Sequence, residues 1–338
     1  MSLPTPCGTL TSAVLEALRA DDPAGLPTTV PALEDPLADD DVQLALWVCY
    51  ELHYQGFKGV PDRWEWEPAL IGLRRELETI VLAQLRAVVN VLPSADHVAR
   101  RLRDLVEGDD GPQLSRYLQS QSSWAQFVEF AKHRSIYQLK EADPHTWAIP
   151  RLRGRAKAAL VEIQFDEYGD GDGERMHSEL YRAMLRELGL SDRYGAYVDD
   201  VPGITLALSN VMSMFGLRRD LRGALAGHLA AYEMTSSGPC RRYSKALRRH
   251  GGSAAACAFY DVHVTADALH EQLAAHDLCG SLAADEPDLA EDIVFGAAAC
   301  LYVDRRFAEH LIGRWDAGQS SLRPAPSPAG ARSLAVAS

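Results

Sequence analysis

The stretch AFYDVHVTADALHEQ, residues 258–272, carries two histidines and an aspartate at helical spacing. His263, Asp267 and His270 stand at i, i+4 and i+7, and at about 100° per residue they fall within roughly 60° of one helical face. Such a stripe directs two imidazoles and a carboxylate at one point, a ligand set that iron, manganese and zinc use. We therefore expect a metal site on this helix, with a polar helix face as the alternative.

A second candidate is FDEYGDGDGERMH, residues 165–177, which at first sight looks like a calcium loop. An EF-hand needs oxygen ligands at loop positions 1, 3 and 5, Gly at 6 and Glu at 12. Counting from Asp166 puts Tyr168 at position 3 and His177 at position 12, and counting from Asp170 puts Arg175 where Gly is required. Calcium is thus disfavoured, which leaves a solvated acidic turn or a site that uses Glu167 and His177.

Further carboxylates precede this turn. Glu162, Asp166 and Glu167 alternate with apolar residues in ALVEIQFDEY, and Glu141 comes just before Pro144, where a helix should end. Taken singly, each is typical of a protein surface. Together with the histidine helix, they form a carboxylate-rich set of the kind that binds two iron or manganese ions inside a helical bundle.

Composition and charge exclude several other classes of protein. The chain of 338 residues has 34 Lys plus Arg against 47 Asp plus Glu, a net charge of −13, which argues against a nucleic-acid surface. It has no apolar run near the roughly 20 residues of a membrane span and no signal peptide, so we expect a cytoplasmic protein without a membrane partner. Six scattered cysteines indicate neither a zinc knuckle nor a disulfide framework.

Helical periodicity recurs along most of the chain, and strand alternation is nearly absent. The fold class is therefore all-α, a helical bundle. The first part, residues 1–112, is expected to be a helical extension, and residues 113–316 the main domain. Residues 317–338 are rich in Ser, Pro and Ala and are expected to be a disordered tail.

The order of these motifs resembles the ligand pattern of the heme-oxygenase-like diiron oxidases and oxygenases, also called iron-containing redox enzymes. The resemblance rests on Glu141, then Glu167 with His177, then His263, Asp267 and His270, and on the stretch EIQFDEYGDGDGERMHSELY. It covers residues 115 to 312. It implies a heme-oxygenase-like bundle with all six residues as metal ligands, and a broken metal-bearing helix at residues 165–177.

The resemblance also implies chemistry: two Fe(II) ions, O2 as co-substrate, and a small-molecule substrate. Because no G-x-G-x-x-G nucleotide motif is present, electrons would come from the substrate or from an external donor such as a reductase or ferredoxin. N-oxygenation of a small amine is the primary expectation. Oxidative C–C cleavage or desaturation of an amino or fatty acid is the alternative, and a non-catalytic heme or ligand carrier is the alternative from another class.

Other polar residues received separate interpretations. Glu174-x-x-His177 mimics a ferritin-like ligand motif, but ferritin-like proteins need two such motifs and no second one occurs. Glu233 is a candidate for the substrate pocket. His228 is isolated in the sequence and is expected to be structural. A homodimer is compatible with the sequence, which does not decide the oligomeric state.

Overall fold

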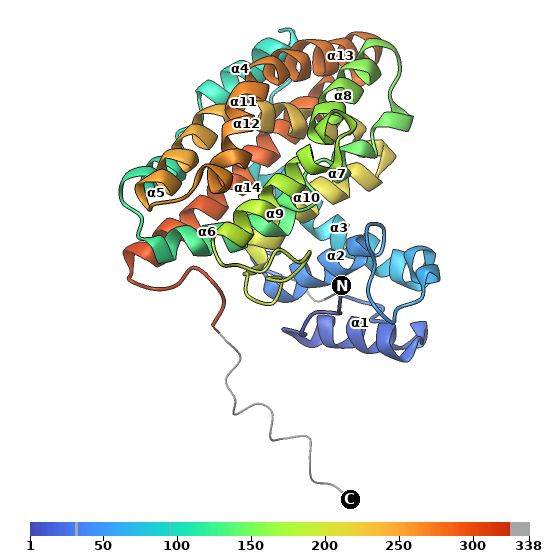
Figure 1. The fold of residues 1–338 in the computed structure, drawn as a ribbon. Coiled ribbons are helices and arrows are strands. Elements are labelled where there is room, and N and C mark those ends of the chain that lie inside the picture. Colours follow the sequence, from blue (N-terminus) through green and yellow to red (C-terminus); the bar gives the residue numbers. More distant parts are fainter. Residues whose placement is uncertain (31–32, 95, 325–338) are drawn as a thin grey trace, which may run out of the picture.

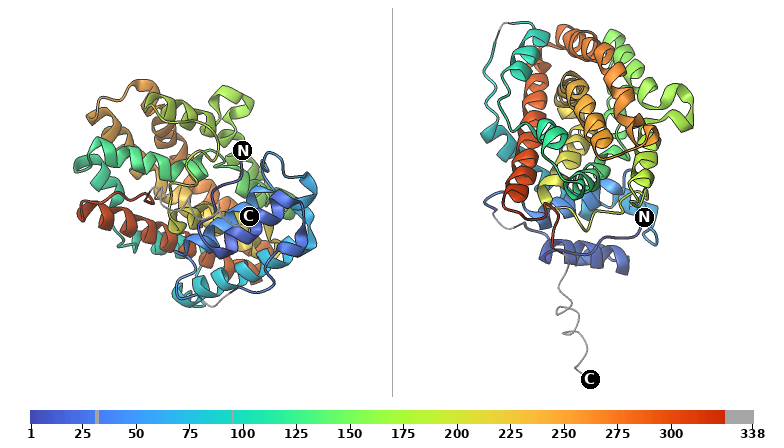
Figure 2. Two further views of the ribbon diagram at one scale, coloured as in Figure 1. Left: turned by 90° about the horizontal axis from the view of Figure 1, so that it is seen from below. Right: turned by 60° about the vertical axis from the view of Figure 1, so that its left-hand side comes forward.

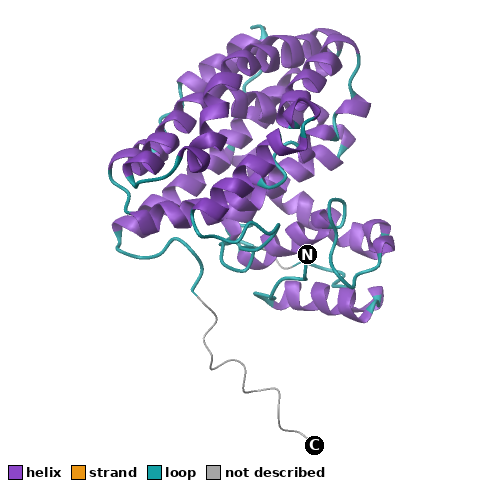
Figure 3. Cartoon of the chain, in the orientation of Figure 1, coloured by secondary structure: helices purple, strands orange, loops and turns teal. Residues whose placement is uncertain are grey.

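Helices and the loops between them make up the whole described part of the chain. The computed structural model describes residues 1–30, 33–94 and 96–324, apart from the side chains of residues 265–269. No strand occurs among these residues (Figure 3). The all-α fold class predicted from the periodicity is confirmed.

The helices pack into one bundle with a common core (Figure 1). Their bounds are α1 (Thr9–Ala20), α2 (Asp40–Glu51), α3 (Pro68–Val88), α4 (Val98–Glu107), α5 (Leu114–Ser120), α6 (Trp124–Gln138), α7 (Asp143–Thr146), α8 (Gly154–Glu167), α9 (His177–Glu187), α10 (Gly203–Leu217), α11 (Arg222–Arg249), α12 (Ala254–Gln272), α13 (Ser281–Asp285) and α14 (Ala290–Asp316). Between α12 and α13 the helix continues as a π-helix, η7 (Leu273–Gly280).

Two helices pass through the interior of the bundle (Figure 2). Every residue of α10 from Gly203 to Gly216 is buried, which fits a helix that is apolar on all sides. The first half of α11 is equally buried, and α11 packs along both α12 and α14. Helix α11 is therefore the element against which the neighbouring helices are placed.

Helices α11 and α14 approach each other closely at two glycines. A Cβ on Gly227 would lie 1.7 Å from the carbonyl oxygen of Ile293, and a Cβ on Gly296 would lie 1.9 Å from that of Ala224. No side chain fits at such distances, so the two backbones touch only because both residues are glycine.

Of the N-terminal helices, α2 packs on α10 and α4 packs on α11, α14 and η7, while α1 and α3 pack on α2 (Figure 1). Asn210 on α10 donates from Nδ2 to the backbone oxygen of Gln43 on α2, at 2.8 Å. Glu51 at the end of α2 forms a buried ion pair with Lys140, and the Tyr194 hydroxyl donates to the same carboxylate at 2.7 Å. The extension thus contacts the segment that carries Glu141. The boundary at residue 112 stays a prediction.

The C-terminal segment is attached to the bundle as far as the structure describes it. The predicted tail begins at residue 317, but Ser320 and Ser321 both donate hydroxyl hydrogen bonds to Glu129, at 2.6 and 2.7 Å. Residues 325–338 lie outside the described part. Among the described helices, none is both long and apolar enough to cross a membrane.

The α11–α14 contact generates a stability prediction. Gly227→Ala and Gly296→Ala should each lower the free energy of unfolding by about 1–3 kcal/mol or more, because the two backbones must separate to admit a methyl group. Chemical denaturation measures the change. Gly313→Ala on the exposed side of α14, where a Cβ meets nothing within 4 Å, is the matched control and should stabilise by up to ~1 kcal/mol. Equal effects at all three positions would contradict the close contact.

Candidate metal centre

The acidic turn singled out in the sequence interrupts a helix. Helix α8 ends at Glu167 and α9 begins at His177, with two short 3₁₀ turns between them. Gly169, Asp170 and Gly171 have positive φ angles of 71°, 56° and 85°. A Cβ on Gly169 would also lie 2.6 Å from the backbone of Arg175 and Met176. Both the positive φ angle and this lack of space therefore require glycine at position 169. The predicted break between Glu167 and His177 is confirmed.

The break brings four predicted ligands together. Glu141, Glu167, His177 and His263 each offer one donor atom, and these atoms all lie within 4.8 Å of one another. Glu141 lies in the turn that joins α6 to α7, just beyond the end of α6. Three of the four side chains are buried and Glu141 is nearly so.

A second group uses the same glutamate. Glu167, Glu233 and His270 also bring donor atoms within 4.8 Å of one another, and all three are buried. Glu233 comes from α11 and His270 from α12. Glu167 therefore belongs to both groups and would be a ligand in either one.

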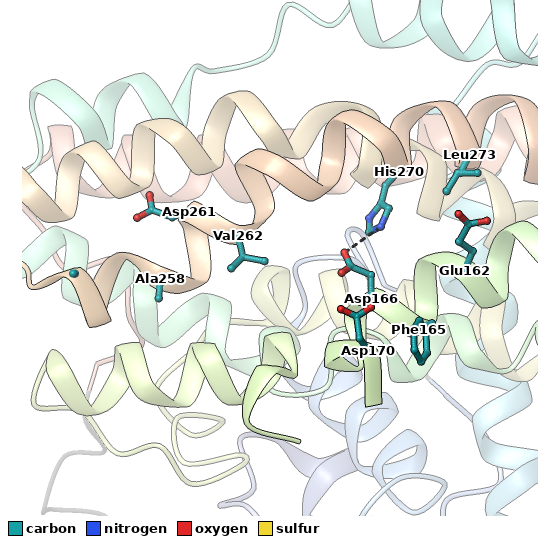
Figure 4. Close-up of a pocket in the computed structure, with 10 residues that line it drawn as sticks. Glu162, Phe165, Asp166, Asp170, Ala258, Asp261, Val262, His270 and Leu273 are labelled. Atoms are coloured by element: carbon teal, nitrogen blue, oxygen red, sulfur yellow. Dashed lines mark ion pairs between the residues drawn. The ribbon is translucent and has the colours of Figure 1, made fainter. Parts of the chain in front are cut away.

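The imidazoles have defined orientations. His263 Nδ1 lies 2.7 Å from the carbonyl oxygen of Phe259, so this nitrogen carries the proton and Nε2 faces Glu141. His270 Nδ1 lies 3.4 Å from Glu233, and its Nε2 lies 3.2 Å from Asp166 (Figure 4). Asp166 is thus placed to fix the ring of His270, as carboxylates do for metal-bound histidines.

The electrostatics of the centre are those of a buried carboxylate among imidazoles. Burial would raise the pKa of Glu167, but His177, and with it His263 and His270, outweighs burial and lowers the pKa to about 2. Burial would lower the pKa of His270, but Glu233 beside it raises that pKa to about 9. The pKa of His177 is raised by Glu167 despite burial. Positive charge is thus strongly favoured here.

The donor side chains are better arranged to bind a metal ion than to form hydrogen bonds with one another. Glu167 Oε2 and His177 Nδ1 are 2.8 Å apart, yet both are buried without an aligned hydrogen bond, and so is His270 Nδ1. Buried polar atoms normally have a partner. Mixed carboxylate and imidazole donors suit iron, manganese or zinc. The residues of both groups therefore fit a metal ion of this kind.

Each predicted site residue can now be placed. Glu141, Glu167, His177, His263 and His270 come together, while the side chain of Asp267 lies outside the described residues. Glu233, a candidate for the substrate pocket, lies with the donor atoms of the second group. Their roles as ligands stay predictions.

Sequence reasoning did not single out His145 and gave Asp166 no role of its own, while His228 was expected to be structural. His228 is buried, and its Nδ1 lies 3.3 Å from Nε2 of His145, which lines the small cavity beside Glu167. Asp166 was named only as a member of the acidic set, and the signal that it lies at the centre was its place directly before Glu167 at the end of α8.

The sharing of Glu167 predicts unequal effects of two glutamate substitutions on metal content. Glu167→Ala should abolish binding of both ions, because it removes a donor from each group. Glu141→Ala should leave the second group intact and retain one ion. Anaerobic titration with Fe(II), followed by iron analysis after desalting, measures the stoichiometry. The same stoichiometry for the two variants would contradict a shared ligand.

A pH dependence follows from the raised histidine pKa values. A metal ion needs the neutral imidazole, and His270 holds its proton up to about pH 9, so metal binding must release protons. Apparent affinity for Mn(II) should therefore rise from about pH 6.5 to about pH 8.5. Calorimetry in buffers of different ionisation enthalpy counts the released protons, and an affinity independent of pH would count against His270 as a ligand.

Comparisons with known proteins agree with this geometry. A family model described as iron-containing redox enzyme matches residues 128–305, more than half of the chain, and spans all the donor residues named above. Nitrosourea synthase from Streptomyces achromogenes subsp. streptozoticus is 26% identical over 136 residues, which cover 40% of this chain and 29% of that protein. The match thus spans less than a third of nitrosourea synthase. The chain belongs to the iron-containing redox enzyme family.

Proposed function

We propose that this chain is a non-heme diiron oxygenase that uses O2 to oxygenate the nitrogen of a small amine. The observation that carries the proposal is Glu167, which stands in both donor groups. Two Fe(II) ions, when bound, supply the electrons that activate O2. An external reductase or ferredoxin would restore them in each turnover.

The protein's own residues hold and orient the centre. Glu141, His177 and His263 would hold one ion, Glu233 and His270 the other, and Glu167 both. The Phe259 carbonyl fixes the tautomer of His263, and Asp166 fixes the ring of His270. Asp267 is one residue of the predicted ligand stripe and stays a candidate for either ion.

A groove between α8 and α12 leads to His270 (Figure 4). Its volume of about 820 Å³ suits a small-molecule substrate. Apolar side chains from Phe165, Val262 and Leu273 line it together with several carboxylates. The lining carboxylates are Glu162, Asp166, Asp170 and Asp261, and no Lys or Arg is among the described lining residues.

The charge of this groove favours an amine among the substrate classes considered. Arg175 pairs with Asp170, Arg248 with Asp261 and His270 with Asp166, so Glu162 is the carboxylate on the acidic face of α8 for which no ion pair occurs among the described residues. Such a face attracts a protonated amine and repels the carboxylate of a fatty acid. Similarity to a protein named nitrosourea synthase also supports chemistry at nitrogen, because a nitrosourea contains an oxidised nitrogen.

The function is tested by loading the protein with two equivalents of Fe(II) without oxygen and mixing it with O2 in a stopped flow. Screening small amines alongside amino and fatty acids should give an amine that speeds oxidation of the iron and becomes a hydroxylamine or nitro product. Glu162→Gln should raise KM for that amine several-fold with little change in kcat, because it removes charge from the groove.

Glu76→Gln on α3 is the matched control, since Glu76 is exposed and lies outside the groove. It should leave KM unchanged. Turnover of a fatty acid with no turnover of any amine would refute N-oxygenation. A heme-type absorption band in the protein as isolated, without bound non-heme iron, would refute the diiron centre altogether.

A further inference from the structure

A separate cavity lies on another side of the metal centre. It has a volume of about 110 Å³ and is enclosed by residues of α6, α11, α12 and α14. Aromatic rings and thiols dominate its wall, notably Tyr137, Tyr232, Tyr243, Cys240 and Cys300. It shares no lining residue with the groove that leads to His270.

A proline in α11 explains why this space exists. Pro239 lies inside the helix, has no backbone N–H to donate to the carbonyl of Thr235, and its ring crowds that carbonyl. Tyr232, Thr235, Pro239 and Cys240 follow one another at helical spacing, and all of them line the cavity. Pro239 thus leaves the Thr235 carbonyl without its helical partner on the face of α11 that lines the cavity.

The cavity is separated from the space beside the donor atoms by side chains that line both. Tyr137, Tyr232 and Ser236 line it and also line the small space of about 40 Å³ beside Glu141, Glu167 and His263. Tyr137 stacks on Tyr232 with ring centroids 5.6 Å apart, and its hydroxyl donates to Glu141 Oε1 at 3.2 Å. A small molecule that passes these side chains arrives directly at the centre.

The size and chemistry of the wall select the occupant. The cavity is several times smaller than the groove, and aromatic rings and two cysteines form half of its lining. Burial raises the pKa of the Cys300 thiol, which therefore stays protonated. Its outer side carries the ion pair of Arg134 with Asp304, at 2.8 Å. Gln138, Thr235 and Ser236 add polar groups to the wall, and the remaining volume is too small for the amine substrates considered above but large enough for a diatomic gas.

We propose that this cavity is the binding site for dioxygen, through which O2 reaches the centre past Tyr137 and Tyr232 while the amine occupies the groove. The proposal rests on the proposed function, since it assigns a route to the co-substrate of that reaction. Separate routes let O2 arrive after the amine has filled the groove.

Xenon tests the site without any activity measurement. Crystals of the unmodified metal-free protein under xenon pressure should show an anomalous peak between Tyr232 and Cys300. Absence of xenon from this cavity would overturn the proposal, whatever reaction the loaded protein performs.

Kinetics test the route. Cys300→Met reduces the space and should lower the second-order rate constant for oxidation of bound Fe(II) by O2 several-fold, without changing the dissociation constant of the amine. Cys49→Met is the matched control, because Cys49 and Cys300 are both 2% exposed but Cys49 lies on α2, away from the cavity. An unchanged rate constant in a folded Cys300→Met protein would overturn the route. Failure of wild-type protein to react with O2 would instead refute the proposed function, and the xenon result would still decide the cavity.

Discussion

A buried carboxylate surrounded by imidazoles is the interaction on which the rest of the centre depends. Glu167 is 8% exposed, and it stands in contact with histidines from α9 and α12. A charge removed from water in this way requires compensation. Protons on the histidines provide it: Glu167 raises the pKa of His177, and Glu233 together with Glu167 raises the pKa of His270. Metal ions replace those protons with the same sign of charge, so one arrangement of helices serves both states.

Several distant features of the chain position this carboxylate. The break after α8 turns the chain so that Glu167 ends one helix and His177 begins the next. The backbone contact at Gly227 and Gly296 sets α11 against α14, and α11 carries Glu233 into the second donor group. The N-terminal helices contribute as well, because the Glu51–Lys140 pair holds the residue before Glu141. The extension is thus part of the support of the centre.

Features that depend on local spacing could be predicted from the sequence. The stripe of His263 and His270 and the break between Glu167 and His177 each lie within one short segment, where helical geometry or glycine conformation decides the outcome. The second donor group could not be predicted in the same way. Glu233 meets Glu167 and His270 only after three helices have packed, and nothing in its own segment distinguishes it from a surface glutamate. The cavity behind Tyr137 is similar, since Pro239 indicates a kink but not which helices surround it.

The most direct test of the account is anomalous diffraction at the iron edge from crystals grown anaerobically with Fe(II). Two iron peaks about 3.5–4 Å apart, both within bonding distance of the Glu167 carboxylate, are the predicted result. One iron peak is expected beside Glu141, His177 and His263, and the other beside Glu233 and His270. A single peak, or iron bound away from Glu167, would contradict the shared-carboxylate centre and the function proposed from it.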